Sequence, residues 1–110
     1  MMSSKIIHME TVGQIIRTKR ESLSLLIRQV ASYIDIDQAI LSKIERNEQK
    51  ATKDNIIKLA EILNLDKVDL LVQFISDRIA YEIAEEDCAS KVLKVAEQKV
   101  KYLKSDLVKN

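Results

Sequence analysis

The sequence contains no proline and only one glycine, Gly13, among its 110 residues. Proline and glycine are the residues that most often end helices and form tight turns, so this chain has few places to reverse direction sharply. Tryptophan is absent as well, and Phe74 is the only phenylalanine. A chain of this length is enough for one domain and one core, and the missing turn residues indicate that it is nearly all helix.

No stretch of the sequence is apolar for long enough to span a membrane. The first ten residues lack the long apolar segment and the cleavage site of a secretory signal. Because they show no clear periodicity, we expect them to form a frayed terminus, with an arm as the alternative. Cys88 is the only cysteine, which allows no internal disulfide and fits a reducing compartment. We therefore expect a cytoplasmic protein without membrane contact.

Groups for catalysis and metal binding are equally scarce. His8 is the only histidine and is far in sequence from Cys88, so neither a metal site nor an activated thiol is indicated. The sequence has no glycine-rich phosphate loop, and no small-molecule ligand is evident. We expect no enzyme activity, no catalytic residue, no metal and no cofactor. The net charge of +1 is too small to attract nucleic acid to the protein as a whole. Binding of nucleic acid would therefore need basic side chains gathered in one place.

Polar residues mark where several helices are expected to begin. Thr11 with Gln14, and Thr52 with Asn55, have the spacing of a capping box, in which each side chain satisfies a free backbone N–H. Ser24 is the expected N-cap of the second helix. These starts divide the first part of the chain into short helices.

The stretch from Ile27 to Arg46 carries the strongest pattern in the sequence. It holds two short amphipathic helical patterns separated by a polar break at Asp35. The apolar positions of these two patterns and of the turn are Val30, Ala31, Ile34, Ile36, Ile40, Leu41 and Ile44. Asp37 stands where an N-cap is wanted before the second pattern. The outer face of the second helix carries small or hydrogen-bonding side chains, which suit a helix that enters a DNA major groove.

This stretch resembles the helix-turn-helix of the Xre and phage-repressor family, and L-S-K-I-E-R at Leu41 to Arg46 is close to the commonest sequence of that family at this place. The resemblance covers Val12 to Leu71. It implies a five-helix repressor-like DNA-binding domain in residues 1–71, whose helix at about residues 38–46 reads the major groove. The function that it implies is sequence-specific regulation of transcription. The alternative is a protein-interaction module of the same fold that has lost DNA binding.

The resemblance also assigns site residues. The expected base-contacting residues are Gln38, Ala39, Ser42 and Lys43, which have the chemistry to contact base edges or the sugar backbone. The expected phosphate-contacting residues are Arg28, Gln29, Arg46, Asn47, Lys50 and Lys53. Arg20 and Glu45 are expected to form a structural ion pair. Without the resemblance, each outer side chain would equally fit the solvated face of an amphipathic helix.

The sequence departs from the family pattern at four places. Leu26 stands where the family usually has serine or threonine, and Ile27 where it usually has a phosphate-binding glutamine. Asp35 and Asn47 stand where it usually has glycine. We expect both to adopt a left-handed backbone, which aspartate and asparagine tolerate better than most residues. Ile27 and Asp35 are the observations that favour the protein-interaction alternative.

Residues 72–110 are expected to form a helical C-terminal extension that serves as a dimerisation segment. Glu85 to Asp87 mark a polar junction within it. The residues Leu93, Ala96, Val100, Leu103 and Leu107 follow a spacing of three and four, which is typical of a short coiled-coil seam. Because paired recognition helices act about a two-fold axis, we expect a homodimer on double-stranded DNA with a palindromic operator. A tail folded back onto its own domain is the alternative.

Overall fold

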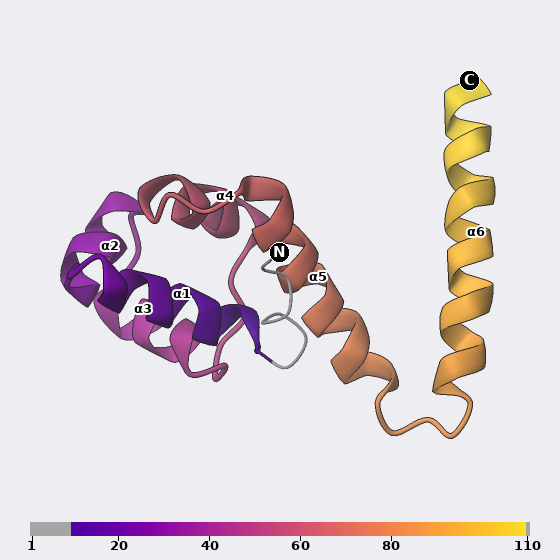
Figure 1. Cartoon of the computed structure of the whole chain (residues 1–110), viewed down its shortest axis with the longest axis horizontal. Helices are drawn as coiled ribbons and strands as arrows, with labels where there is room; N and C mark the ends of the chain where they lie inside the picture. The colour runs from indigo at the N-terminus through magenta and orange to yellow at the C-terminus, as the bar shows by residue number, and fades with distance from the viewer. Residues whose placement is uncertain (1–9, 110) are drawn as a thin grey trace. The chain divides into compact units, whose positions relative to one another are not determined.

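The computed structural model describes residues 10–109; the expectations for the first nine residues, His8 included, lie outside this range. Six helices and no strand occur in it (Figure 1): α1 (Val12–Ser22), α2 (Ile27–Tyr33), α3 (Gln38–Glu45), α4 (Lys53–Ile62), α5 (Lys67–Ile83) and α6 (Ala89–Lys109). The predicted all-α fold with a C-terminal helix is confirmed. None of these helices is long and apolar enough to cross a membrane.

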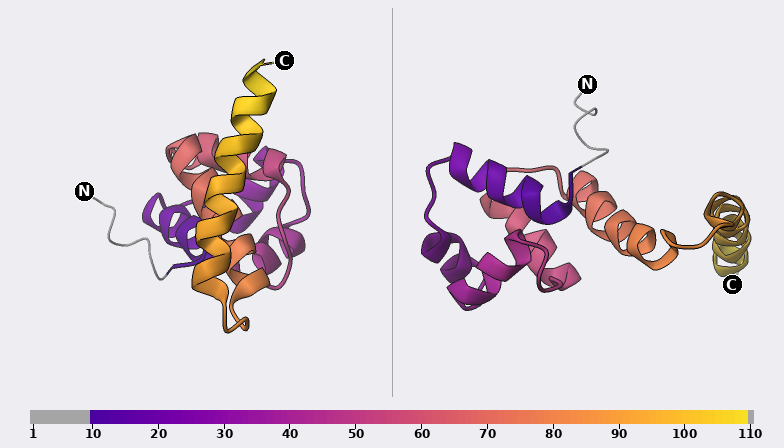
Figure 2. Two further views of the ribbon diagram at one scale, coloured as in Figure 1. Left: turned by 90° about the vertical axis from the view of Figure 1, so that its right-hand side faces the viewer. Right: turned by 90° about the horizontal axis from the view of Figure 1, so that it is seen from below.

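The chain divides into two compact units, Met1–Arg78 and Ile79–Asn110. In the first unit α3 packs against both α1 and α2, and α2 also packs against α4. Figure 2 shows from two further sides that α1 to α4 gather around one centre. The buried apolar side chains there are Val12, Ile16, Val30, Ala31, Ile34, Leu41, Ile44, Ile56, Leu59, Ala60, Leu63, Leu70 and Phe74. Every apolar residue predicted to form the two central helical patterns and their turn belongs to this core or packs against it.

Both predicted capping boxes are present. The Thr11 hydroxyl accepts from the Gln14 backbone N–H at 3.2 Å, and Gln14 Oε1 accepts from the Thr11 N–H at 3.1 Å. Thr52 and Asn55 exchange the same two bonds at the start of α4, at 3.1 and 3.2 Å. The first turns of α1 and α4 are therefore satisfied by side chains close in sequence.

Within residues 10–109, four residues other than glycine adopt a left-handed backbone, each shortly after a helix: Ser24 (φ 57°), Asp35 (φ 59°), Asn47 (φ 62°) and Asn64 (φ 55°). The predictions for Asp35 and Asn47 are confirmed. The prediction that Ser24 caps the second helix is wrong, because an N-cap needs an extended backbone. Ser24 instead closes the turn after α1, where its N–H donates to Glu21 O at 3.0 Å, and Leu26 is the N-cap of α2.

The first unit continues beyond Leu71, where the family resemblance ends. Phe74 is only 7% exposed and completes one side of the core. Asp77 Oδ2 accepts a hydrogen bond from the Val12 backbone N–H at 2.7 Å. This N–H belongs to the first turn of α1 and has no partner within that helix. The first half of α5 is therefore part of the domain that holds the helix-turn-helix.

Candidate nucleic-acid interface

Helix α3 has two chemically different faces. Its inner face places Leu41, Ile44 and Glu45 in the buried interior. On its outer face Gln38, Ala39 and Lys43 are exposed, and Ser42 is half-buried. The expected base-contacting residues therefore lie on the side of the helix that the domain leaves open.

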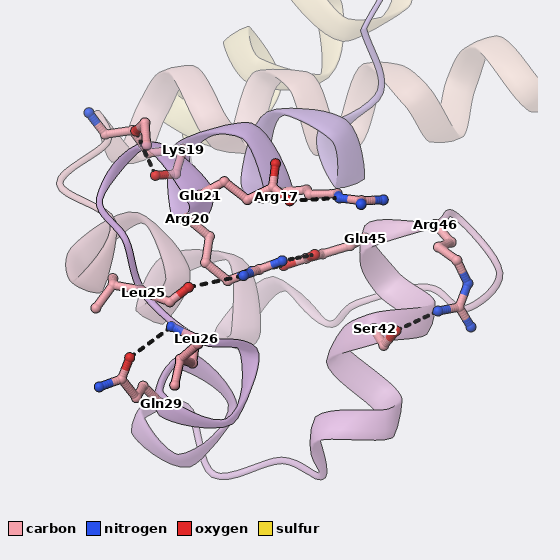
Figure 3. Close-up of polar contacts among 11 residues, drawn as sticks. Arg17, Lys19, Arg20, Glu21, Leu25, Leu26, Gln29, Ser42, Glu45 and Arg46 are labelled. Atoms are coloured by element: carbon pink, nitrogen blue, oxygen red, sulfur yellow. Dashed lines mark hydrogen bonds and ion pairs between the residues drawn. The ribbon is translucent and has the colours of Figure 1, made fainter.

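An ion pair ties α3 to α1. Arg20 Nε and Nη2 donate to the two carboxylate oxygens of Glu45 at 2.8 and 3.0 Å, and Arg20 Nη1 donates to the backbone carbonyl of Leu25 at 3.0 Å (Figure 3). The two side chains are only 13% and 3% exposed. Hydrogen bonding to Glu45 raises the pKa of the Arg20 guanidinium, and partial burial opposes that rise. The structure therefore brings together the residues that the family resemblance pairs, and the pair fixes α1, the following loop and α3 in one register.

Gly13 allows the closest approach between α1 and the end of α3. A Cβ atom at this position would collide with the backbone oxygen of Ile44 and would lie 2.8 Å from that of Glu45. It would also lie 2.9 Å from the Asn47 side-chain oxygen. Sequence reasoning gave Gly13 no role, although a lone glycine inside a helical pattern is a recognised sign of close packing. Beside it, Asn47 Nδ2 donates to the Thr11 hydroxyl at 2.8 Å, which holds the loop after α3 against α1.

Helix α2 begins without the usual polar N-cap. Leu26 has an extended backbone but no side-chain oxygen, so it cannot accept from the free N–H groups of the first turn. Gln29 supplies the other half of a capping box, because its Oε1 accepts from the Leu26 N–H at 2.7 Å (Figure 3). The Gln29 NH₂ group remains able to donate to a phosphate. Ile27 packs against the core, and Arg28 is exposed.

The turn between α2 and α3 carries negative charge on its surface. Asp35 and Asp37 are both exposed. Asp37 occupies the N-cap position of α3, as predicted, but its side chain makes no capping hydrogen bond. Both carboxylates are close in sequence to Gln38, the first residue of the outer face.

Arg46 is held by its neighbours in a way that sequence reasoning missed. Its Nε and Nη2 donate to the two carboxylate oxygens of Glu48, both at 3.1 Å. Nη1 also donates to the Ser42 hydroxyl (Figure 3). This bidentate pair raises the pKa of Arg46 and lowers the pKa of Glu48, with the Lys43 charge adding slightly to the second effect. The two residues follow the end of a helix at a spacing of two, which matches no standard pairing pattern.

The remaining predicted phosphate contacts lie around the start of α4. Lys50 and Lys53 are both exposed and stand on either side of the Thr52 cap. Among the residues that the structure describes, neither lysine forms an ion pair with an acidic side chain. The exposed Arg28, Lys50 and Lys53 thus come from one compact unit that also carries the outer face of α3.

Comparison with known proteins identifies the fold. The model of the helix-turn-helix family matches residues 16–70, which is half of the chain. The chain is similar to the crystal structure of the clp gene regulator ClgR from Corynebacterium glutamicum, with 21% identity over 77% of this chain and 88% of that chain and a TM-score of 0.52. It is also similar to a chain of the SinR protein/SinI protein complex, with 20% identity over 86% of this chain and 99% of that chain and the same TM-score of 0.52.

At these identities the two structures show a shared fold, and the family match identifies the motif. None of the curated proteins compared with the sequence matches it significantly. The matched residues include α2 and α3, the two helices of the predicted motif. The resemblance to Xre and phage-repressor proteins is thereby confirmed: the chain belongs to the helix-turn-helix family.

Proposed function

We propose that this protein is a dimeric, sequence-specific DNA-binding regulator of transcription that reads the major groove with α3. Membership of the helix-turn-helix family supports a DNA-binding transcription regulator. The observation that carries the finer proposal is the division of α3 into a buried, ion-paired inner face and an open outer face. A helix held this firmly on one side presents its other side to a groove at little entropic cost.

Base recognition falls to the outer face of α3. Gln38 is able to bond an adenine edge through two hydrogen bonds, and Lys43 to donate to guanine. Ala39 contributes a methyl group that fits against the thymine methyl. Ser42 already accepts from Arg46, so its own hydroxyl hydrogen remains free for a base or a sugar.

Phosphate contacts position the domain on the duplex. Arg28 and the Gln29 amide serve at the start of α2, and Lys50 and Lys53 serve around the start of α4. Asn47 donates to Thr11 through one amide hydrogen, so its second one is available for a phosphate. Arg46 keeps N–H donors on Nη1 and Nη2 for a phosphate, but the Glu48 carboxylate offsets its charge.

Two-fold pairing completes the proposal. Recognition helices of this class act in pairs on palindromic sites, and the apolar stripe of α6 offers an interface between two copies. In this proposal the DNA-binding residues lie within residues 1–71, the first part of α5 completes their domain, and the dimerisation segment lies in the rest of residues 72–110. A regulator works where the DNA is, so the cytoplasmic location expected from the sequence is part of the same proposal.

A second candidate function is a protein-interaction module that keeps the fold without binding DNA. The observations that favour it are specific. Ile27 packs against the core where a phosphate-binding glutamine is usual in the family, Asp35 adds negative charge to the turn, and Glu48 neutralises Arg46. None of them blocks the outer face of α3, so we rank this candidate second.

Selection of duplexes from a random pool at two salt concentrations distinguishes the two functions. We expect a palindromic site whose affinity falls steeply with salt, because Lys and Arg release counterions from the phosphates. No enrichment together with no salt dependence would instead support the interaction module.

Two substitutions test how the contacts are divided. Q38A should relax specificity at one base position and cost about 1–3 kcal/mol of binding free energy on the selected site. K50A should weaken binding to all sequences alike and reduce the salt slope by about 1. If the two variants lost affinity in the same manner, the division into base and phosphate contacts would be wrong.

A further inference from the structure

Helix α6 carries an apolar stripe that the described side chains of its own unit leave exposed. Every side chain from Ser90 to Leu107 is exposed. Within that range the stripe residues Leu93, Val100, Leu103 and Leu107 are between 49% and 72% exposed. Most helical stability in proteins comes from packing an apolar face against another surface. The stripe therefore needs a partner surface.

The spacing of the stripe indicates the kind of partner. Leu93, Ala96, Val100, Leu103 and Leu107 alternate steps of three and four, which is the seam of a coiled coil. A seam of this kind fits a second helix with the same spacing. A second copy of α6 meets this requirement.

We propose that α6 pairs with α6 of a second copy in the antiparallel direction, with Val100 opposite Leu103 of the second copy and Ala96 opposite its Leu107. This inference rests on the homodimer of the proposed function and adds its surface and direction. The size of the seam residues favours it, because the small Ala96 then faces the larger Leu107 in both halves of the pair. A parallel pair would set Ala96 against Ala96 and leave that layer poorly filled.

The charged residues that flank the seam point to the same arrangement. Glu97 and Lys104 directly follow seam positions on one side, and Lys99 and Asp106 directly precede seam positions on the other. In the proposed pair Glu97 lies beside Lys104 of the second copy, and Lys99 lies beside its Asp106. Two-fold symmetry makes each of these opposite-charge pairs occur twice.

Other arrangements bring like charges together. A parallel pair in register places Lys99 beside Lys104 of the second copy. An antiparallel pair shifted by one heptad places either Glu97 beside Glu97 or Lys104 beside Lys104. Because like charges across a seam are destabilising, the flanking residues select one direction and one register.

Cysteine cross-linking of the full chain tests the direction. Cys88 is exposed and is first replaced, so the variants are C88S/A96C and C88S/L107C. When the two are mixed and oxidised, we expect a disulfide between A96C of one chain and L107C of the other. The antiparallel pair holds like cysteines far apart, so each variant alone should stay uncross-linked. Rapid self-cross-linking of each variant alone would show a parallel pair and would overturn the inference without touching the proposed homodimer.

Charge reversal tests the register through the dimer dissociation constant, measured by sedimentation equilibrium at low salt without DNA. K104E should weaken the dimer by about tenfold, because two attractive pairs become repulsive. The double variant E97K/K104E should restore it. K94E is the matched control, since it makes the same charge change on the outward side of α6 and should leave the constant unchanged. Equal effects of K104E and K94E, or a wild-type chain that stays monomeric, would overturn the inference.

The results of these two experiments can be distinguished from a failure of the proposed function. A monomer would remove the homodimer and this interface together. A dimer with the wrong cross-links would remove only the antiparallel pairing. DNA binding is tested separately, by site selection.

Discussion

Glu45 is the one charged side chain in the buried interior of the part of the chain that the structure describes. A buried carboxylate is tolerable only when it is paired, and Arg20 provides both of the hydrogen bonds that its oxygens accept. Removing either partner leaves the other without compensation. We therefore expect R20A or E45A to lower the free energy of unfolding by about 3–5 kcal/mol.

Urea denaturation of the two single variants and of R20M/E45L measures this effect. The double apolar variant should lose less stability than either single one, because no lone charge remains. The control is the exposed pair of Arg17 and Glu21 on the same helix, whose side chains are both 56% exposed. R17A should cost at most about 0.5 kcal/mol. Similar losses for R17A and R20A would contradict the assigned role of burial.

Glu48 is a second single residue with a testable effect, in this case on DNA affinity and not on stability. It pairs with the Arg46 guanidinium, which the proposed function assigns to a DNA phosphate, and Arg46 lowers the pKa of Glu48, so the carboxylate stays charged at neutral pH. We expect E48Q to raise DNA affinity by about tenfold, since it frees one cation and removes one anion. The slope of affinity against salt should steepen by about 1.

Filter binding or fluorescence anisotropy over a salt series measures both quantities. The charge-matched control is E85Q, in the exposed junction between α5 and α6. It makes the same change of net charge but should leave the slope unchanged. An unaltered slope for E48Q would mean that Arg46 takes no part in phosphate binding.

How far single residues could be predicted depended on how local their interactions are. The caps at Thr11 and Thr52 were predictable because both partners lie within one turn. The Arg20–Glu45 pair was accessible only through the family resemblance, since the two residues are distant in sequence. The bond from Val12 to Asp77 joins residues 65 positions apart and has no sequence signature. Leu26 was missed as an N-cap because leucine carries no capping group.

At the scale of helices, the packing of α1 on α3 depends on the missing side chain of Gly13. An alanine there would gain about 1 kcal/mol of helix propensity. Its Cβ would nevertheless meet two backbone oxygens that cannot move without shifting the end of α3. The cost of this collision should exceed the gain in helix propensity. We therefore expect G13A to lower the free energy of unfolding by about 1–3 kcal/mol.

Thermal or urea unfolding of G13A alongside T18A tests this expectation. Thr18 is exposed on the same helix, so T18A should change stability by less than about 0.5 kcal/mol. A G13A protein as stable as the wild type would mean that α1 and α3 separate easily. That result would also remove the argument that α3 is held rigidly for binding.

The helices themselves were largely predictable, because apolar spacing and caps are recorded along the chain. The exact ends of the helices were less predictable. The predicted start of α2 is too early, since Ser24 has the side chain of a cap but takes a left-handed backbone. How the helices approach one another was not predictable from spacing, which says which face is buried but not what covers it.

At the scale of the whole molecule, the limit of the first unit has a measurable consequence. The family resemblance ends at Leu71, yet Phe74 is buried and Asp77 bonds the start of α1. We expect a chain ending at Leu71 to be less stable than one ending at Ala84 by about 3–5 kcal/mol, mostly through the loss of the Phe74 ring. Urea denaturation of the two truncated chains measures the difference.

The matched control is F74A in the full-length protein. It should reproduce most of that loss, because the ring supplies most of the buried apolar area concerned. If both truncated chains were equally stable, the part of α5 beyond Leu71 would be dispensable for the domain. The folding unit would then end where the resemblance ends.

The two-sided character of α3 has a consequence for how such a protein changes its target. The stability of the domain depends on the buried residues of α3, which are Leu41, Ile44 and Glu45. Its four outer positions contribute almost nothing to that stability. Under the proposed function, stability and target choice therefore depend on different residues of this short helix. A lineage could then exchange the outer residues one at a time and move to a new operator while the domain stays folded. The outer residues of α3 can change while its inner residues keep the helix in place.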